Sequence, residues 1–167
     1  MKEMTENEAR LRLETLCASS EQCSHDMEEK LRKWGITEEA RARIMAHLVE
    51  ERYVDDERFC RAFVKDKIRY NKWGRRKVEQ ALFLKRIPNE VSRPILDAVD
   101  DEEYLRVLRP LLASKRRSLR ATDDYEARAK LVRFALGRGF SYDLIRRCMK
   151  ADDITVDDDG ADDEFLA

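Results

Sequence analysis

The segment Leu31-Arg-Lys-Trp-Gly-Ile36 returns twice along the chain, as Leu82-Phe-Leu-Lys-Arg-Ile87 and as Ala135-Leu-Gly-Arg-Gly-Phe140. When the copies are aligned on their last residues, six columns in and around them hold apolar residues. In chain order these are Met27, Leu31, Ile36, Ala40, Ile44 and Met45; Val78, Leu82, Ile87, Val91, Ile95 and Leu96; and Leu131, Ala135, Phe140, Leu144, Cys148 and Met149. The copies lie 51 and 53 residues apart. Self-similarity at a regular period is typical of a tandem-repeat protein.

The spacing within each copy predicts two helices joined by a tight turn. The residues nine and five positions before the alignment point share one helix face, and those four, eight and nine positions after it share a face of the next helix. Gly35 and Gly139 stand where a helix ends in the left-handed conformation. A third helix is expected before each pair, over residues 5–19, 56–69 and 101–118. The predicted fold class is all-α, with three tandem three-helix repeats that form an elongated, curved body.

The expected units are residues 1–53 (repeat 1), 54–100 (repeat 2, basic), 101–151 (repeat 3) and 152–167 (an acidic, disordered tail). Helix starts are marked by residues that suit an N-cap, namely Ser24, Thr37, Asp55, Asp123 and Ser141. Pro88 suits the first turn of the sixth helix. Pro94 should kink that helix or move its start downstream.

Charge is divided unevenly along the chain. Charged residues make up 41% of the 167 residues, and the net charge is −1. Residues 152–167 hold eight acidic and no basic residues, so residues 1–151 carry 34 basic against 27 acidic residues, a net charge of +7. An acidic segment with few apolar residues does not pack well. The tail is either a solubilising end, which is the interpretation we prefer, or a competitor of nucleic acid for the basic body.

Composition and motifs argue against several classes of protein. No apolar run approaches the ~20 residues that span a bilayer, and the N-terminal sequence lacks the apolar core of a signal peptide, so we expect a cytoplasmic protein. We also expect a monomer. No phosphate-binding loop or nucleophile motif is present, and Asp55-Asp56 suits capping. We therefore expect no catalytic residue, no cofactor and no metal. Structural thiols without zinc-type spacing are expected at Cys17, Cys23, Cys60 and Cys148.

Basic residues concentrate in the middle of the chain, where ten Lys or Arg and two acids lie between Arg61 and Arg86. The candidate binding residues are Lys65, Arg69, Lys72, Arg75, Arg76 and Lys77, with a smaller set at Arg146, Arg147 and Lys150. Cations at the start of a helix oppose its dipole, so an outside anion is expected to compensate at residues 75–77. This pattern favours a surface for phosphates or for an acidic protein over a merely solvated face. Tyr70 and Trp73 either pack in the core, which we favour, or stack on bases.

Residues of the second and third repeats resemble the signature of the RecX family. Tyr53-Val-Asp-Asp-Glu-Arg-Phe59 is followed by Phe63-Val64, a basic stretch to Gly74, Val78-x-x-Ala-Leu82 and Lys85-Arg-Ile87. This order is similar to the family's Y-[LI]-D-D-x-x-[FY], basic helix, G-P turn and I-x-x-E-L-x-x-K-G-I. Ala129–Phe134, Arg138-Gly-Phe140 and Asp143-Leu-Ile145 are similar to the family's C-terminal pattern. The resemblance covers most of residues 20–150 and is strongest over 53–87.

The sequence departs from the family pattern at three places. Arg75 stands where a proline usually follows Gly74, Ala81 replaces a usual glutamate, and Arg86-Ile87-Pro88 replaces the pattern Lys-Gly-Ile plus a polar residue. Two of these changes make the charge more positive, and the turn at Gly74 loses the rigidity of a proline.

The resemblance implies a non-enzymatic protein that binds along the RecA–single-stranded DNA filament. It implies a regulator, most often an inhibitor, that limits filament growth and damps ATP hydrolysis and strand exchange, with a role in DNA recombination, DNA repair and the SOS response. On this interpretation the candidate cations contact the filament and its phosphate backbone without reading sequence. The alternatives are a nucleic-acid-binding helical module without RecA dependence, and an adaptor that binds only proteins.

Overall fold

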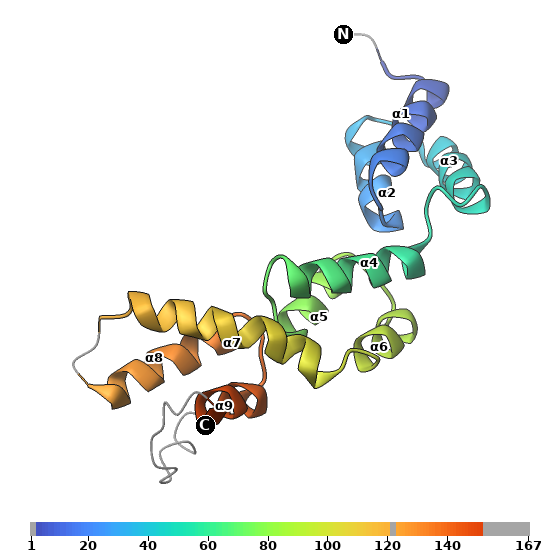
Figure 1. The fold of residues 1–167 in the computed structure, drawn as a ribbon. Helices are drawn as coiled ribbons and strands as arrows, with labels where there is room; N and C mark the ends of the chain where they lie inside the picture. Colours follow the sequence, from blue (N-terminus) through green and yellow to red (C-terminus); the bar gives the residue numbers. More distant parts are fainter. Residues whose placement is uncertain (1–2, 121–122, 152–167) are drawn as a thin grey trace. The chain divides into compact units, whose positions relative to one another are not determined.

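The structure is a computed structural model that describes residues 3–120 and 123–151. Within these ranges the chain forms nine helices and no strand (Figure 1). They are α1 (Glu6–Ser19), α2 (Ser24–Lys33), α3 (Glu38–Glu50), α4 (Asp56–Arg69), α5 (Arg75–Leu84), α6 (Asn89–Asp97), α7 (Asp101–Ser118), α8 (Asp124–Gly137) and α9 (Tyr142–Ala151). The all-α prediction is confirmed. The expected disorder of residues 152–167 concerns a segment outside the described residues.

The helices follow one another in three groups of three, as the repeat predicts. The first helix of each group, α1, α4 or α7, lies within one residue of its predicted range. The eighteen residues of the six apolar columns are all buried except Met45 and Val91, which are half-buried. Burial of these columns supplies the main driving force for folding, at about 1.5–3 kcal/mol for each large apolar side chain.

The second helix of each group ends in the same turn. Gly35, Arg86 and Gly139 have positive φ angles of 76°, 58° and 95°. The backbone N–H of the following residue bonds the carbonyl five positions earlier, over 3.1–3.2 Å: Ile36 to Leu31, Ile87 to Leu82 and Phe140 to Ala135. This is the Schellman motif, in which the residue after the left-handed one is apolar and buried. Arg86 adopts it without glycine, at a cost of about 1–2 kcal/mol.

Most of the predicted helix starts are confirmed. Four predicted capping residues accept a hydrogen bond from the backbone N–H three residues on: Thr37, Asp55, Asp123 and Ser141. The prediction for Ser24 is wrong, because Ser24 is the first residue of α2 and the N-cap position is held by Cys23, without a side-chain bond. The Ser24 N–H instead donates to the carboxylate of Asp56 over 2.8 Å.

The two prolines of the sixth helix behave differently. The carbonyl of Pro88 accepts from the N–H groups of Val91 and Ser92, both over 3.0 Å, so Pro88 stands directly before α6, one residue ahead of the first turn where it was predicted. Pro94 lies inside α6, which begins at Asn89, so the expected downstream start is wrong. The missing N–H of Pro94 removes one later bond of the helix and leaves the bonds that start it intact.

By their contacts the described residues form two compact units: unit 1, with residues 3–63 and 82–95, and unit 2, with residues 64–81, 96–120 and 123–151. In unit 1, α3 packs on α1 and α2, and the core includes Leu13, Met27, Leu31, Ile44 and Leu48. In unit 2, α7, α8 and α9 pack on one another, around buried residues that include Leu105, Leu108, Leu131 and Ile145. The repeat boundaries and the elongated body stay predictions. No helix of the described ranges is both long and apolar enough to cross a membrane.

Candidate nucleic-acid interface

The candidate cations of the middle repeat lie in unit 2, on the last turns of α4, in the turn that follows, and on the first turn of α5. Four of the six are exposed, and within residues 3–120 and 123–151 their side chains form no hydrogen bond or ion pair. We call these four the α4–α5 cation cluster: Lys65, Arg69, Lys72 and Arg76. Lys65 and Arg69 are one helical turn apart, with Cβ atoms about 5–6 Å from each other. The cluster therefore presents positive charge that no described carboxylate neutralises.

Arg75 is set apart from the cluster by its own ion pairs. Its Nη2 lies 2.7 Å from Oδ1 of Asp97, and its Nε lies 3.7 Å from Oε1 of Glu79. Partial burial works against the charge of Arg75, but the hydrogen bond to Asp97 and the neighbouring acids outweigh it and raise the pKa of the guanidinium. Arg75 thus has an internal role in unit 2, and its predicted contact with a ligand is not tested.

Lys77 is half-buried and packs on an aromatic ring. Its Nζ lies 5.0 Å from the ring centroid of Trp73, and the Nζ of Lys67 lies 5.2 Å from the same centroid. Cation–π contacts of this kind contribute about 0.5–1 kcal/mol at exposed sites. Trp73 is itself half-buried, which agrees with the packing role that we favoured for it.

Tyr70 is not a core residue, contrary to the preferred interpretation of the sequence. Its relative exposure is 71%, whereas Val64 and Ile68 of the preceding helix are buried. The helical period explains the difference, because Val64 and Ile68 are four residues apart on the inner face and Tyr70 falls off that face. An exposed aromatic ring therefore stands in the sequence between Arg69 and Lys72, two members of the cation cluster.

The first turn of α5 is bonded within the chain. The Gly74 N–H donates to the carbonyl of Arg138 over 2.8 Å, and the Arg76 N–H donates to the carbonyl of Gly139 over 3.1 Å. These carbonyls lie at the end of α8, where the helix dipole places partial negative charge. The two bonds satisfy backbone N–H groups at the start of α5, but no described acidic side chain pairs with Arg76, so the outside anion expected there stays a prediction.

The two glycines of this junction permit a direct backbone contact. A Cβ atom on Gly74 would lie 2.3 Å from the backbone N of Phe140, and one on Gly139 would lie 2.5 Å from the backbone N of Lys77. The contact fixes the start of α5, and with it Arg76, against the turn between α8 and α9.

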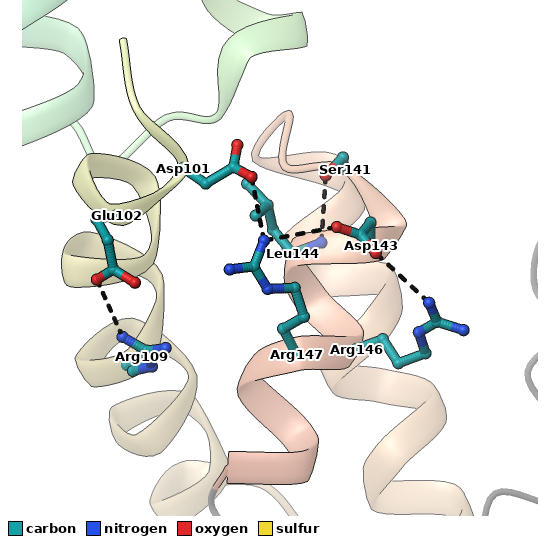
Figure 2. Close-up of polar contacts among 8 residues, drawn as sticks. All are labelled: Asp101, Glu102, Arg109, Ser141, Asp143, Leu144, Arg146 and Arg147. Atoms are coloured by element: carbon teal, nitrogen blue, oxygen red, sulfur yellow. Dashed lines mark hydrogen bonds and ion pairs between the residues drawn. The ribbon is translucent and has the colours of Figure 1, made fainter.

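The candidate cations of the third repeat lie on α9 and are largely paired. Nη1 of Arg147 lies 3.1 Å from Oδ2 of Asp101 and 3.7 Å from Oδ2 of Asp143. Nη2 of Arg146 lies 3.4 Å from Oδ1 of Asp143, and Figure 2 shows Asp143 between the two guanidinium groups. Lys150 is exposed near the end of the helix. Exposed ion pairs contribute only about 0–1 kcal/mol, so this second set stays a prediction.

Metal and thiol chemistry find no support in the described residues. No group of three His, Cys, Asp or Glu side chains there could hold a metal ion. Burial raises the pKa of the Cys23 and Cys60 thiols to about 11. Asp55 accepts from the Arg58 N–H and Asp56 from the Ser24 N–H. The conspicuous acid pair therefore serves to fix the start of α4 and to tie it to α2.

The comparisons with known proteins agree with this architecture. The chain matches the family models "RecX, second three-helix domain" over residues 55–93 and "RecX, third three-helix domain" over residues 101–149. It resembles the crystal structure of RecX from Lactobacillus salivarius with a TM-score of 0.75 and 18% identity, over 90% of this chain and 97% of that one. It also resembles a crystal structure of regulatory protein RecX, with a TM-score of 0.79 and 19% identity, over 87% of this chain and 73% of that one. At such identities the likeness shows the fold alone.

Curated relatives extend the comparison to sequence. The Regulatory protein RecX of Clostridium botulinum (strain Eklund 17B / Type B) is 32% identical over 124 residues, which are 73% of this chain and 58% of the relative's length. The chain thus spans less than two thirds of that relative. The Regulatory protein RecX of Chlorobaculum tepidum is 30% identical over 125 residues, 75% of this chain and 76% of its own. Because a relative of this identity aligns over three quarters of both chains and two RecX domain models match in order, the chain belongs to the RecX family of regulatory proteins.

Proposed function

We propose that this chain is a cytoplasmic modulator of the RecA recombinase and that its effect is inhibition. It acts by binding the RecA–single-stranded DNA filament. Family membership supports the link to regulation. The observation that carries the binding mode is the α4–α5 cation cluster, whose four exposed side chains have no acidic partner in the described part of unit 2. Unpaired surface cations attract a polyanion and release its counterions on contact.

Binding of this kind needs no catalytic pocket. A protein that binds the assembled filament and its dissociated parts with different affinity shifts the equilibrium between them by that difference. The proposed result is less filament growth, and therefore less RecA-dependent ATP hydrolysis and strand exchange.

The test is RecA-dependent ATP hydrolysis on single-stranded DNA, titrated with this protein. The test variant removes the cluster's charge through Lys65→Gln, Arg69→Gln, Lys72→Asn and Arg76→Gln. Asparagine is chosen at residue 72 because Lys72 has a φ of 58° and asparagine tolerates the left-handed conformation. A matched control removes four other exposed cations: Arg32→Gln, Lys33→Gln, Arg93→Gln and Arg106→Gln. We expect the wild-type chain and the control to reduce hydrolysis, and the cluster variant to need a much higher concentration. Equal potency of all three proteins would refute the role of the cluster.

A second measurement distinguishes the proposed function from the alternative, which is a nucleic-acid-binding module without RecA dependence. The protein's affinity for bare single-stranded DNA is compared with its affinity for RecA-coated DNA. Tighter binding to the coated strand supports the proposed function, and equal or weaker binding supports the alternative.

A further inference from the structure

Tyr70 is an exposed aromatic side chain in a strongly basic setting. It directly follows the last residue of α4, between Arg69 and Lys72 of the cation cluster. With 71% of its surface exposed, its ring gains little from the protein's own core. Trp73, three residues on, is instead half-buried beside the ammonium groups of Lys67 and Lys77. Of the two aromatic residues in this turn, Tyr70 is thus the one with surface available to a ligand.

The backbone that carries Tyr70 is fixed at several points. The Trp73 N–H donates to the carbonyl of Lys67 over 3.1 Å, and the guanidinium of Arg138 donates to the carbonyl of Asn71 over 3.0 Å. The bond from the Gly74 N–H to the Arg138 carbonyl closes the turn on its other side. These bonds hold Lys72 at a φ of 58°, a conformation that costs an L-residue about 1–2 kcal/mol.

A rigid aromatic anchor has a physical advantage in binding. A tyrosine has few rotatable bonds, and on a fixed backbone it loses little conformational entropy when a ligand covers it. Every nucleobase has a flat face that stacks on such a ring, whereas the cations around it attract phosphates. In a duplex the faces of the bases are covered by their neighbours, so only an unpaired base can use the ring.

We propose that Tyr70 is a stacking platform for an unpaired base, and that the α4–α5 cation cluster binds the phosphates on either side of that base. The inference deepens the proposed function and rests on it, since it names the feature of the ligand that the cluster contacts. Phosphates then provide most of the salt-dependent affinity, and the base on Tyr70 provides a preference for single strands over duplex.

A second exposed tyrosine gives a matched control. Tyr125 is 55% exposed near the start of α8 and lies between Asp124 and Glu126 in the sequence. Acidic neighbours repel phosphates, so this ring should not take part in nucleic-acid binding. Tyr70→Ala and Tyr125→Ala therefore remove the same side chain from surroundings of opposite charge.

The experiment measures binding of the full chain to three fluorescent probes by anisotropy: an oligothymidine strand, an abasic strand of equal length, and a duplex. We expect Tyr70→Ala to weaken binding to oligothymidine by about 5- to 150-fold and to leave binding to the abasic strand unchanged. Tyr70→Phe and Tyr125→Ala should bind like the wild type. Thermal unfolding checks that Tyr70→Ala folds normally, as the exposure of the side chain predicts.

The outcomes separate this inference from the proposed function. If Tyr70→Ala binds all three probes like the wild type while the cluster variant loses affinity, stacking is refuted and the phosphate surface stands. If Tyr70→Ala weakens binding to the abasic strand as much as to oligothymidine, the residue does not act through a base and the inference is also refuted. If the wild-type chain binds none of the probes, the inference is refuted, whereas the proposed function is still tested separately by binding to RecA-coated single-stranded DNA.

Discussion

Alanine at Gly139 should destabilise the chain because it breaks the backbone contact that fixes the start of α5. Its φ of 95° lies in the left-handed region, and a Cβ there would lie 2.5 Å from the backbone N and 2.6 Å from the Cβ of Lys77. The left-handed conformation costs an L-residue about 1–2 kcal/mol. Forcing a methyl group into closely packed backbone costs about 1–3 kcal/mol more. We expect the free energy of unfolding to fall by about 2–5 kcal/mol.

The other described glycines separate the two causes. Gly35 has a φ of 76° with nothing within 4 Å of its Cβ position, so alanine there should cost only the conformational part, about 1–2 kcal/mol. Gly74 does not have a positive φ, but a Cβ atom there would lie 2.3 Å from the backbone N of Phe140. Alanine at Gly74 should therefore lower the free energy of unfolding by the steric part alone, about 1–3 kcal/mol. A Cβ atom added to Gly137, at the end of α8, would have no other atom within 4 Å. Alanine there should be neutral or stabilise by up to about 1 kcal/mol.

The assay is urea-induced unfolding of the four variants, with one tryptophan reporting on each unit. Trp34 lies in unit 1 and Trp73 in unit 2, so a Trp34→Phe background isolates the signal of the unit that holds Gly74 and Gly139. The order of destabilisation should be Gly139, then Gly74 and Gly35, then Gly137. If Gly139→Ala and Gly74→Ala cost no more than Gly137→Ala, the close approach of the two turns does not exist.

Further predictions concern the thiols, the two arginines of α5 and the core. At pH 8 the thiols of Cys23 and Cys60, with pKa values of about 11, should be only about one part in a thousand ionised, so an aromatic disulfide reagent should modify them only after unfolding. Fast modification of Cys23 or Cys60 in the folded chain, located by peptide mapping, would contradict this. Arg76→Gln should weaken DNA binding, whereas Arg75→Gln should mainly alter stability, by up to about 1 kcal/mol; the opposite pattern in anisotropy and urea unfolding would refute the assignment. Leu82→Ala, at a side chain only 1% exposed, should cost about 2–5 kcal/mol in urea unfolding; a loss below 1 kcal/mol would contradict its place in the core.

The sequence was sufficient to predict the helices because their information is local. Apolar residues at helical spacing, a glycine at each of two turns and capping side chains all act within a few positions of each other. Even the second turn, where Arg86 replaces glycine, could be located, because Ile87 repeats the buried position of Ile36.

The site was predicted less completely because its partners are distant in sequence. Arg75 meets Asp97, and Arg147 meets Asp101 across 46 positions; no local pattern distinguishes these acids from other surface acids. The contact between Gly74 and Gly139 likewise has no periodic signal. Tyr70 is different, because the spacing of Val64 and Ile68 already placed it off the inner face, and a general preference for burying aromatic residues misled the interpretation.

The central claim is that the α4–α5 cation cluster binds phosphates of the strand within the filament. Its most direct test is the salt dependence of the chain's affinity for RecA-coated single-stranded DNA. If all four cations contact phosphates, the slope of log affinity against log salt should include about −3 from the cluster, since each contact on a single strand contributes about −0.7. The cluster variant should lose that part of the slope, and the control variant should keep it. A wild-type affinity that does not change with salt, or equal slopes for the wild type and the cluster variant, would contradict the claim.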